Sequence, residues 1–315
     1  MKIAYFGLPL GALLLARDGH QLGPVVLSPV EAPGRFRLRA GRARPGQPEP
    51  SALIDTLDAD DDLESRVQRA LNRESPDLLV SWFWTRKLPV ASLEAPPLGA
   101  IGVHPSLLPR HRGPNPFYWA IDSGDDITGV TAHRLSAEYD TGPVFAARRL
   151  RIGDRDAWQL ARALDRPSLE LLRETALRFA RGERLAQTTQ DEAQASWAPE
   201  PTGDALRVDF GWTTERILRR IRALSPTPGL ALEVEGVRLF VTRAEAAGWG
   251  RSPSHHEIDP YLKALLPGEA HISDALLLRT GDGAVRVVGA YFPEGEASAP
   301  DAAGVVAKLS QRPKP

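Results

Sequence analysis

The chain has 315 residues, and at roughly 150 residues per domain this length favours two domains. Apolar residues make up 42% and charged residues 25%, which is typical of a folded globular protein and excludes wholesale disorder. The 39 basic and 40 acidic side chains leave a net charge of −1, so no overall positive field indicates a polyanionic partner. With no Cys, the sequence excludes a disulfide framework, a Cys-ligated metal and a thiol nucleophile.

Buried strands alternate with helices through the first two thirds of the chain. The apolar runs predict strands at 3–6, 24–27, 77–81 and 99–104, and helices from about 8 to 17, at 62–72, 116–121 and 158–181. The strands predicted at 128–135 and 144–152 flank a turn and have an antiparallel pattern, and the prolines within 29–50 predict a loop. This alternation is typical of an α/β domain with a mostly parallel sheet.

A polar stretch at 190–204, with Pro199, Pro201 and Gly203, predicts a linker. We therefore expect a first domain at 1–195, a linker at 196–206 and a second domain at 207–315. Beyond the linker, a helix is predicted at 214–224, with short strands at 232–234, 237–242, 275–279 and 284–291. Short strands separated by glycine turns predict a small open barrel.

The start of the chain does not have the pattern of a signal peptide, because Gly7 and Pro9 interrupt its apolar run. No segment approaches the roughly 18 apolar residues of a membrane span. We expect a soluble, cytoplasmic protein that does not contact membranes.

His104 ends a predicted parallel strand, where α/β proteins bind their ligands, and Asp140 lies on a later loop. A His oriented by a carboxylate is a common general acid–base unit, because the carboxylate fixes the tautomer of the ring. A His at a strand end can equally be a structural residue, so the pair alone leaves both possibilities open.

The surroundings of His104 resemble the folate-dependent formyltransferase family. His104, Ser106–Pro109, Arg112–Gly113 and Asp140–Gly142 match the motif of that family in order and spacing, and residues 76–80, 87–89 and 128–131 match its flanking segments. Residues 221–229 and 281–283 resemble the C-terminal domain of methionyl-tRNA formyltransferases, so the resemblance covers nearly the whole chain.

This resemblance implies a Rossmann-like catalytic domain, an OB-like barrel and 10-formyltetrahydrofolate as the formyl donor to an amine. His104 would transfer a proton or stabilise an oxyanion, and Asp140 would hold its ring. The folate site would be lined by Ser106, Leu107, Leu108, Pro109, Trp84, Leu88 and Gly142. His111 would either contact the acceptor or lie on the surface.

One position departs from the family pattern. The family has an Asn two residues before the His, and here that residue is Gly102, which has no side chain to donate to an oxyanion. We hypothesise that Asn115 replaces this donor; water or a backbone amide are alternatives. A chain without a replacement would be a poor catalyst, or a non-catalytic binder of folate or RNA.

The acceptor amine stays open between two classes. Arg35, Arg37, Arg39, Arg42 and Arg44 lie in a segment without acidic residues, which resembles the tRNA-contacting insertion of methionyl-tRNA formyltransferases. Initiator tRNA is therefore the predicted partner, although a solvated basic loop would have the same composition. A nucleotide-linked amino sugar is the alternative acceptor. We expect no metal, because His255 and His256 are adjacent and have no obvious third ligand.

Overall fold

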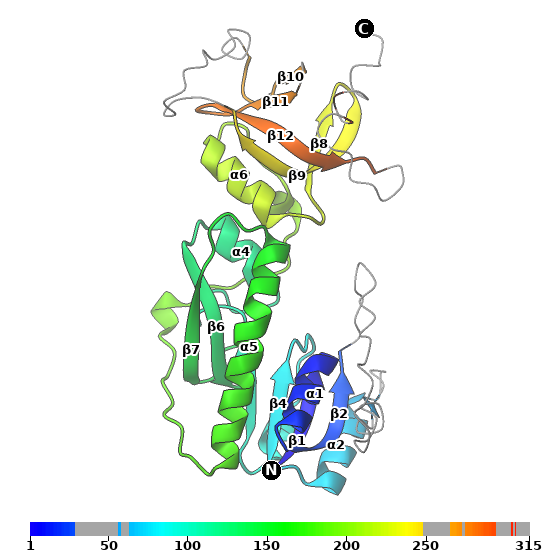
Figure 1. Cartoon of the computed structure of the whole chain (residues 1–315), viewed down its shortest axis with the longest axis vertical. Helices are drawn as coiled ribbons and strands as arrows, with labels where there is room; N and C mark the ends of the chain where they lie inside the picture. Colours follow the sequence, from blue (N-terminus) through cyan, green and yellow to red (C-terminus); the bar gives the residue numbers. More distant parts are fainter. Residues whose placement is uncertain are drawn as a thin grey trace. The chain divides into compact units, whose positions relative to one another are not determined.

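The computed structural model describes residues 1–28, 56–57, 63–247, 265–272 and 275–293, together with residues 304 and 306 (Figure 1). The whole of the predicted loop 29–50 lies outside these residues. The same holds for the pair His255–His256 and for all five predicted RNA-binding positions, Arg35, Arg37, Arg39, Arg42 and Arg44. None of the helices in the described ranges has the length and apolar character that crossing a membrane requires.

The chain forms two compact units that interleave in sequence. The first comprises Met1–Pro114, Thr128–Leu150 and Ala163–Ala198, and the second comprises Asn115–Ile127, Arg151–Arg162 and Pro199–Pro315.

A seven-stranded sheet organises the first unit, with the strand order β3-β2-β1-β4-β5-β6-β7. Its strands are β1 (Lys2–Gly7), β2 (Gln21–Leu27), β3 (Thr56–Leu57), β4 (Leu78–Trp82), β5 (Ala100–His104), β6 (Ile127–Arg134) and β7 (Val144–Arg151). The pairs from β3 to β5 are parallel, and β6 runs antiparallel to β5. The prediction of a Rossmann-like, mostly parallel sheet is therefore confirmed.

The helices α1 (Pro9–Arg17), α2 (Leu63–Glu74) and α3 (Val90–Glu94) connect the parallel strands, and α5 (Ala157–Ala180) follows β7. Phe6, Leu79 and Ala100 contribute one apolar side chain each from β1, β4 and β5 to a core cluster, and Val67 and Leu71 of α2 cover it. Such runs, buried on both sides, are what a parallel sheet with helices on its faces requires. Sequence reasoning missed the short elements α3 and β3.

The second unit contains a curled five-stranded antiparallel sheet, in the order β10-β11-β12-β9-β8 (Figure 1). Its strands are β8 (Leu230–Val234), β9 (Val237–Ala246), β10 (Ala270–Ile272), β11 (Leu276–Arg279) and β12 (Ala284–Tyr291), and α6 (Thr214–Ala223) packs on β9 and β12. The predicted class of a small, barrel-like β domain is confirmed, and β10 is an addition to the predicted strands.

A buried ion pair joins α4 (Pro116–Asp122) to α6 within the second unit. Asp122 is 5% exposed and accepts hydrogen bonds from both Arg216 and Arg220, with 2.6 Å for the shortest contact to each. Burial alone would raise the pKa of Asp122, but the hydrogen bonds from Arg220 and Arg216 outweigh it and hold the pKa below its ordinary value.

Candidate active site

His104 lies at the C-terminal end of β5, and its side chain is 8% exposed. Its Nε2 lies 2.7 Å from the carbonyl oxygen of His111, so Nε2 carries a proton and donates it to this acceptor. Its Nδ1 lies 3.4 Å from Oδ2 of Asp140. Each ring nitrogen faces an oxygen acceptor, so the orientation of the ring is set on both sides.

Asp140 has a neighbour at each carboxylate oxygen. Oδ2 accepts a hydrogen bond of 2.9 Å from the backbone N–H of Gly113, in addition to facing His104. Oδ1 lies 3.6 Å from Nε2 of His133, a buried side chain on β6 whose pKa burial lowers to about 4. His133 is therefore neutral at neutral pH.

The buried hydroxyl of Thr131 holds the loop Ser106–Pro109 by two hydrogen bonds. Thr131 of β6 lies opposite His104 in the β5–β6 ladder. Its Oγ1 donates to the carbonyl of Ser106 at 2.7 Å and accepts from the N–H of Leu108 at 3.1 Å. The loop predicted to line the folate site thus starts directly beside His104 and is held in one shape. His111 is 4% exposed, so a surface location for it is wrong.

Gly142, another predicted folate contact, follows Asp140 in a turn that approaches β6 closely. A Cβ on Gly142 would lie 1.9 Å from the carbonyl oxygen of Arg134, so only glycine fits there. The local reason for this residue is therefore the close backbone approach, and any ligand contact would come in addition.

The space beside Gly102 is filled by a neighbouring side chain. A Cβ on Gly102 would lie 2.8 Å from Cδ2 of Leu135, which is closer than real Cβ atoms come to their neighbours. Leu135, Trp84 and Leu88 all pack against the core cluster that contains Phe6 and Ala100. The apolar side chain of Leu135 therefore lies where a side chain at position 102 would begin.

Trp84 has an unused hydrogen-bond donor. Its ring lies edge-on to Phe6 with 5.5 Å between the ring centroids, and its Nε1 is buried without a hydrogen-bond partner in the described part of the chain. A buried donor without a partner is costly, so a ligand acceptor at this point would be stabilised.

Asn115 caps α4 in the second unit. Its Oδ1 accepts from the backbone N–H of Tyr118 at 3.3 Å, and its Nδ2 donates to Oε2 of Glu200 at 3.0 Å. Glu200 thus holds one of the two N–H groups of this amide, and the oxyanion role hypothesised for Asn115 would fall to the other.

Sequence reasoning assigned no role to His133, Leu135 or Gln190. The register of the β5–β6 pair could have placed His133 near the site. Gly102 pairs directly with His133, and paired residues point to the same face of the sheet. In the described ranges, no group of three or more His, Cys, Asp or Glu side chains is arranged to hold a metal ion.

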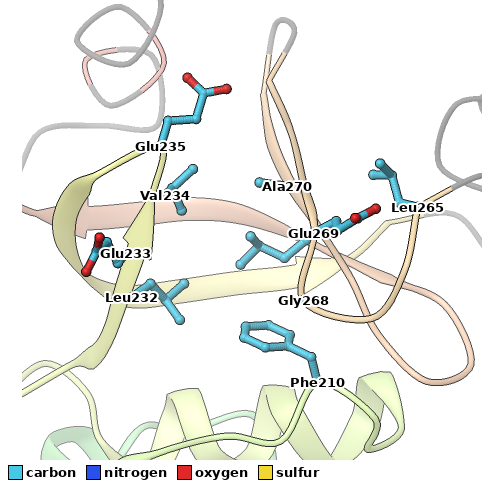
Figure 2. Close-up of a pocket in the computed structure, with 10 residues that line it drawn as sticks. Phe210, Leu232, Glu233, Val234, Glu235, Leu265, Gly268, Glu269 and Ala270 are labelled. Carbon is cyan, nitrogen blue, oxygen red and sulfur yellow. The ribbon is translucent and has the colours of Figure 1, made fainter. Parts of the chain in front are cut away.

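The second unit contains a separate cavity of about 410 Å³ (Figure 2). Figure 2 shows Phe210 and Leu232 next to one another in its lining, which also includes the acidic side chains of Glu233, Glu235 and Glu269. These carboxylates would repel a phosphate backbone, so we do not assign this cavity to a nucleic acid.

A parallel α/β sheet with a buried His–Asp pair at the end of a strand defines a protein suited to proton transfer on a bound ligand. Residues 2–172 match the formyl transferase family, and residues 202–302 match the C-terminal domain of formyl transferases. The chain belongs to the formyl transferase family. The predicted domain limits at 195 and 206 stay a prediction.

Curated relatives and solved structures agree with this family. The chain is 31% identical over 308 residues to the methionyl-tRNA formyltransferase of Janthinobacterium sp. (strain Marseille), covering 94% of each protein. It is 34% identical over 251 residues to the methionyl-tRNA formyltransferase of Thermus thermophilus, covering 77% of this chain and 79% of the relative.

Among solved structures, HypX from Aquifex aeolicus in complex with tetrahydrofolic acid has a TM-score of 0.64 at 22% identity, with 99% of this chain and 48% of HypX covered. The chain thus spans about half the length of HypX. WlaRD, a sugar 3N-formyl transferase solved with dTDP and 5-N-formyl-THF, has a TM-score of 0.63 at 12% identity, with 94% of this chain and 99% of WlaRD covered. These two likenesses establish a shared fold.

Proposed function

We propose that this protein transfers the formyl group of 10-formyltetrahydrofolate to the methionine amino group of charged initiator tRNA. The observation that carries the proposal is the buried His104–Asp140 pair at the end of β5, within the residues that match the formyl transferase family. The identity of 31–34% to methionyl-tRNA formyltransferases, over most of the chain, supports this acceptor.

The residues around His104 fit a folate. The loop Ser106–Pro109 begins next to His104, Leu135 lies beside Gly102, and the partly buried Leu88 packs against the same core cluster as Leu135. The Nε1 of Trp84 supplies a buried donor for a polar ring atom. The folate provides the formyl group, and its nitrogen regains a proton when the amine becomes a formamide.

The chain's own residues then have defined tasks. His104 holds a proton on Nε2, and it can pass this proton to the substrate once the substrate replaces the carbonyl of His111 as the acceptor. Asp140 orients the ring through Nδ1. Gly113 fixes the carboxylate by its N–H, so that Asp140 stays directed at His104.

Gly102 lacks the amide donor of the family, and this loss would lower the rate of formyl transfer. Loss of one oxyanion donor costs about 10²–10³ in rate in other enzymes. Asn115 is the proposed substitute, through the N–H group that does not bind Glu200. The arginines Arg35, Arg37, Arg39, Arg42 and Arg44 are proposed contacts for the tRNA phosphates. Because charged initiator tRNA is a cytoplasmic molecule, the proposal places the protein in the cytoplasm.

The test is incubation of the purified protein with 10-formyltetrahydrofolate and either charged initiator tRNA or a nucleotide-linked amino sugar. We expect formyl transfer to the tRNA and none to the sugar. Transfer to the sugar alone would replace the proposed acceptor. Transfer to neither, with the folate still bound, would show that Gly102 has turned the chain into a binding protein.

A further inference from the structure

The turn that carries Asp140 is held by a side chain from a distant part of the sequence. Gln190 is 7% exposed, and its Nε2 donates to the carbonyl oxygens of both Asp140 and Gly142, at 2.7 Å each. One amide group thus binds the carbonyls at both ends of the three-residue turn that begins with Asp140.

The same amide is bound on its other side by Arg112. Oε1 of Gln190 accepts from Nη2 of Arg112 at 2.8 Å and from Nε at 3.1 Å. Arg112 is itself 7% exposed and forms a two-pronged ion pair with Glu192, at 2.7 and 2.9 Å. Because an amide has two N–H groups and two lone pairs, every hydrogen-bonding position of Gln190 is used.

Arg112 belongs to the loop that contacts both members of the His–Asp pair. The preceding residue, His111, accepts from Nε2 of His104, and the following residue, Gly113, donates to Oδ2 of Asp140. Gln190 therefore ties this loop to the turn, and the distance between His104 and Asp140 depends on both.

Backbone strain at the two ends of this connection shows why a clamp is needed. His111 and Asp140 both have a φ of 58°, in the left-handed region that residues with a Cβ rarely adopt. Such conformations persist only where surrounding contacts impose them. Around Asp140, the contacts include the hydrogen bonds from Gln190 to the turn and from Gly113 to the carboxylate. The hydroxyl of Thr141 adds hydrogen bonds to Ser136 and to the carbonyl of Glu138.

We propose that Gln190 is a positioning residue of the transfer site, which holds the Asp140 carboxylate against His104 by clamping the Asp140–Gly142 turn to Arg112. The activity part of this proposal rests on the proposed formyl transfer, whereas its spectroscopic part does not.

The test compares two variants that lose the donors to the turn. Gln190→Met is neutral and of similar volume, and Gln190→Glu keeps the acceptor for Arg112 while losing both N–H groups. Gln194→Met is the matched control, because Gln194 is exposed on the same segment and its side chain binds only Asp191. The first measurement is the nitrogen chemical shifts of the His104 ring at neutral pH, assigned with His104→Gln.

In both Gln190 variants, we expect the His104 ring shifts to move towards those of Asp140→Asn, and the control to keep the parent shifts. We also expect kcat for formyl transfer to fall about 10- to 100-fold, as for a catalytic group displaced by about 1 Å, with an unchanged KM for the charged tRNA. Gln190→Met and Gln190→Glu must shift the His104 ring signals in the same direction, because such agreement excludes the added charge of Glu as the cause of the shift.

Parent ring shifts in both folded variants would overturn the proposal, and so would failure of both to fold, which would make Gln190 a residue of general stability. If the parent protein transfers no formyl group, the ring shifts still decide the positioning role. The two proposals can therefore fail separately.

Discussion

The buried imidazole of His133 should make the stability of the first unit depend on pH. Burial lowers its pKa from 6.5 to about 4, and Asp140, which favours the charged form, only partly offsets this. Each pKa unit is worth about 1.4 kcal/mol, so the whole difference corresponds to about 3 kcal/mol. The folded state binds this proton less readily than the unfolded state. The stability is therefore fully present above pH 6.5 and is lost as the pH falls towards about 4.

The perturbation is His133→Met, which removes the titrating group and roughly keeps its volume. Hydrogen exchange of the β5 and β6 amides, corrected for the intrinsic effect of pH, measures the free energy of opening. From neutral pH to about pH 4.5, the parent should lose about 2–3 kcal/mol relative to the variant. Ile101→Val, at a buried apolar position on β5, should differ from the parent by a constant amount at every pH. A constant difference for His133→Met as well would refute the reasoning.

Three further substitutions test other parts of the account. Asp122→Asn should destabilise the second unit by about 3–5 kcal/mol, because it leaves two arginines without their buried anion, and thermal unfolding measures this; a loss below about 1 kcal/mol would contradict the ion pair's role. Asn115→Asp keeps the oxygen that caps α4 and removes the amide donor, so kcat should fall by about 10²-fold if Asn115 serves the oxyanion, whereas the parent rate would end that hypothesis. Gly102→Asn would place a Cβ against Cδ2 at the flexible end of Leu135, so we expect a moderately lower melting temperature that changes when Leu135→Ala is added. Equal melting temperatures for the single and double variants would show that Leu135 does not fill this space.

The sequence predicts the residues at the centre of the site, but not the hydrogen bonds that hold them in place. His104 and Asp140 could be found because a strand-end His and a later Asp fall at family spacing, and β5 indeed ends at His104. Gln190 could not be found, since its stretch has the polar composition of a linker. An exposed segment and a segment that is hydrogen-bonded to the loop beside His104 contain the same residue types, so only the fold distinguishes them.

The same limit explains the surroundings of Gly102. The sequence alone shows that Gly102 stands where the family has an Asn. That Leu135 fills the space beside Gly102 depends on a diagonal contact between β5 and the end of β6. Such a contact depends on the register of the two strands, and a shift of one residue would turn every side chain to the other face. The register also brings His133 to Asp140, which spacing alone did not indicate.

The most direct test of the central claim is formyl transfer from 10-formyltetrahydrofolate to charged initiator tRNA by the parent protein and by His104→Ala. The account predicts transfer by the parent and none above background by the variant, which should still bind the folate and melt at a similar temperature. Transfer by His104→Ala at the parent rate would contradict the assignment of His104 as the proton-transfer residue, and with it the proposed mechanism.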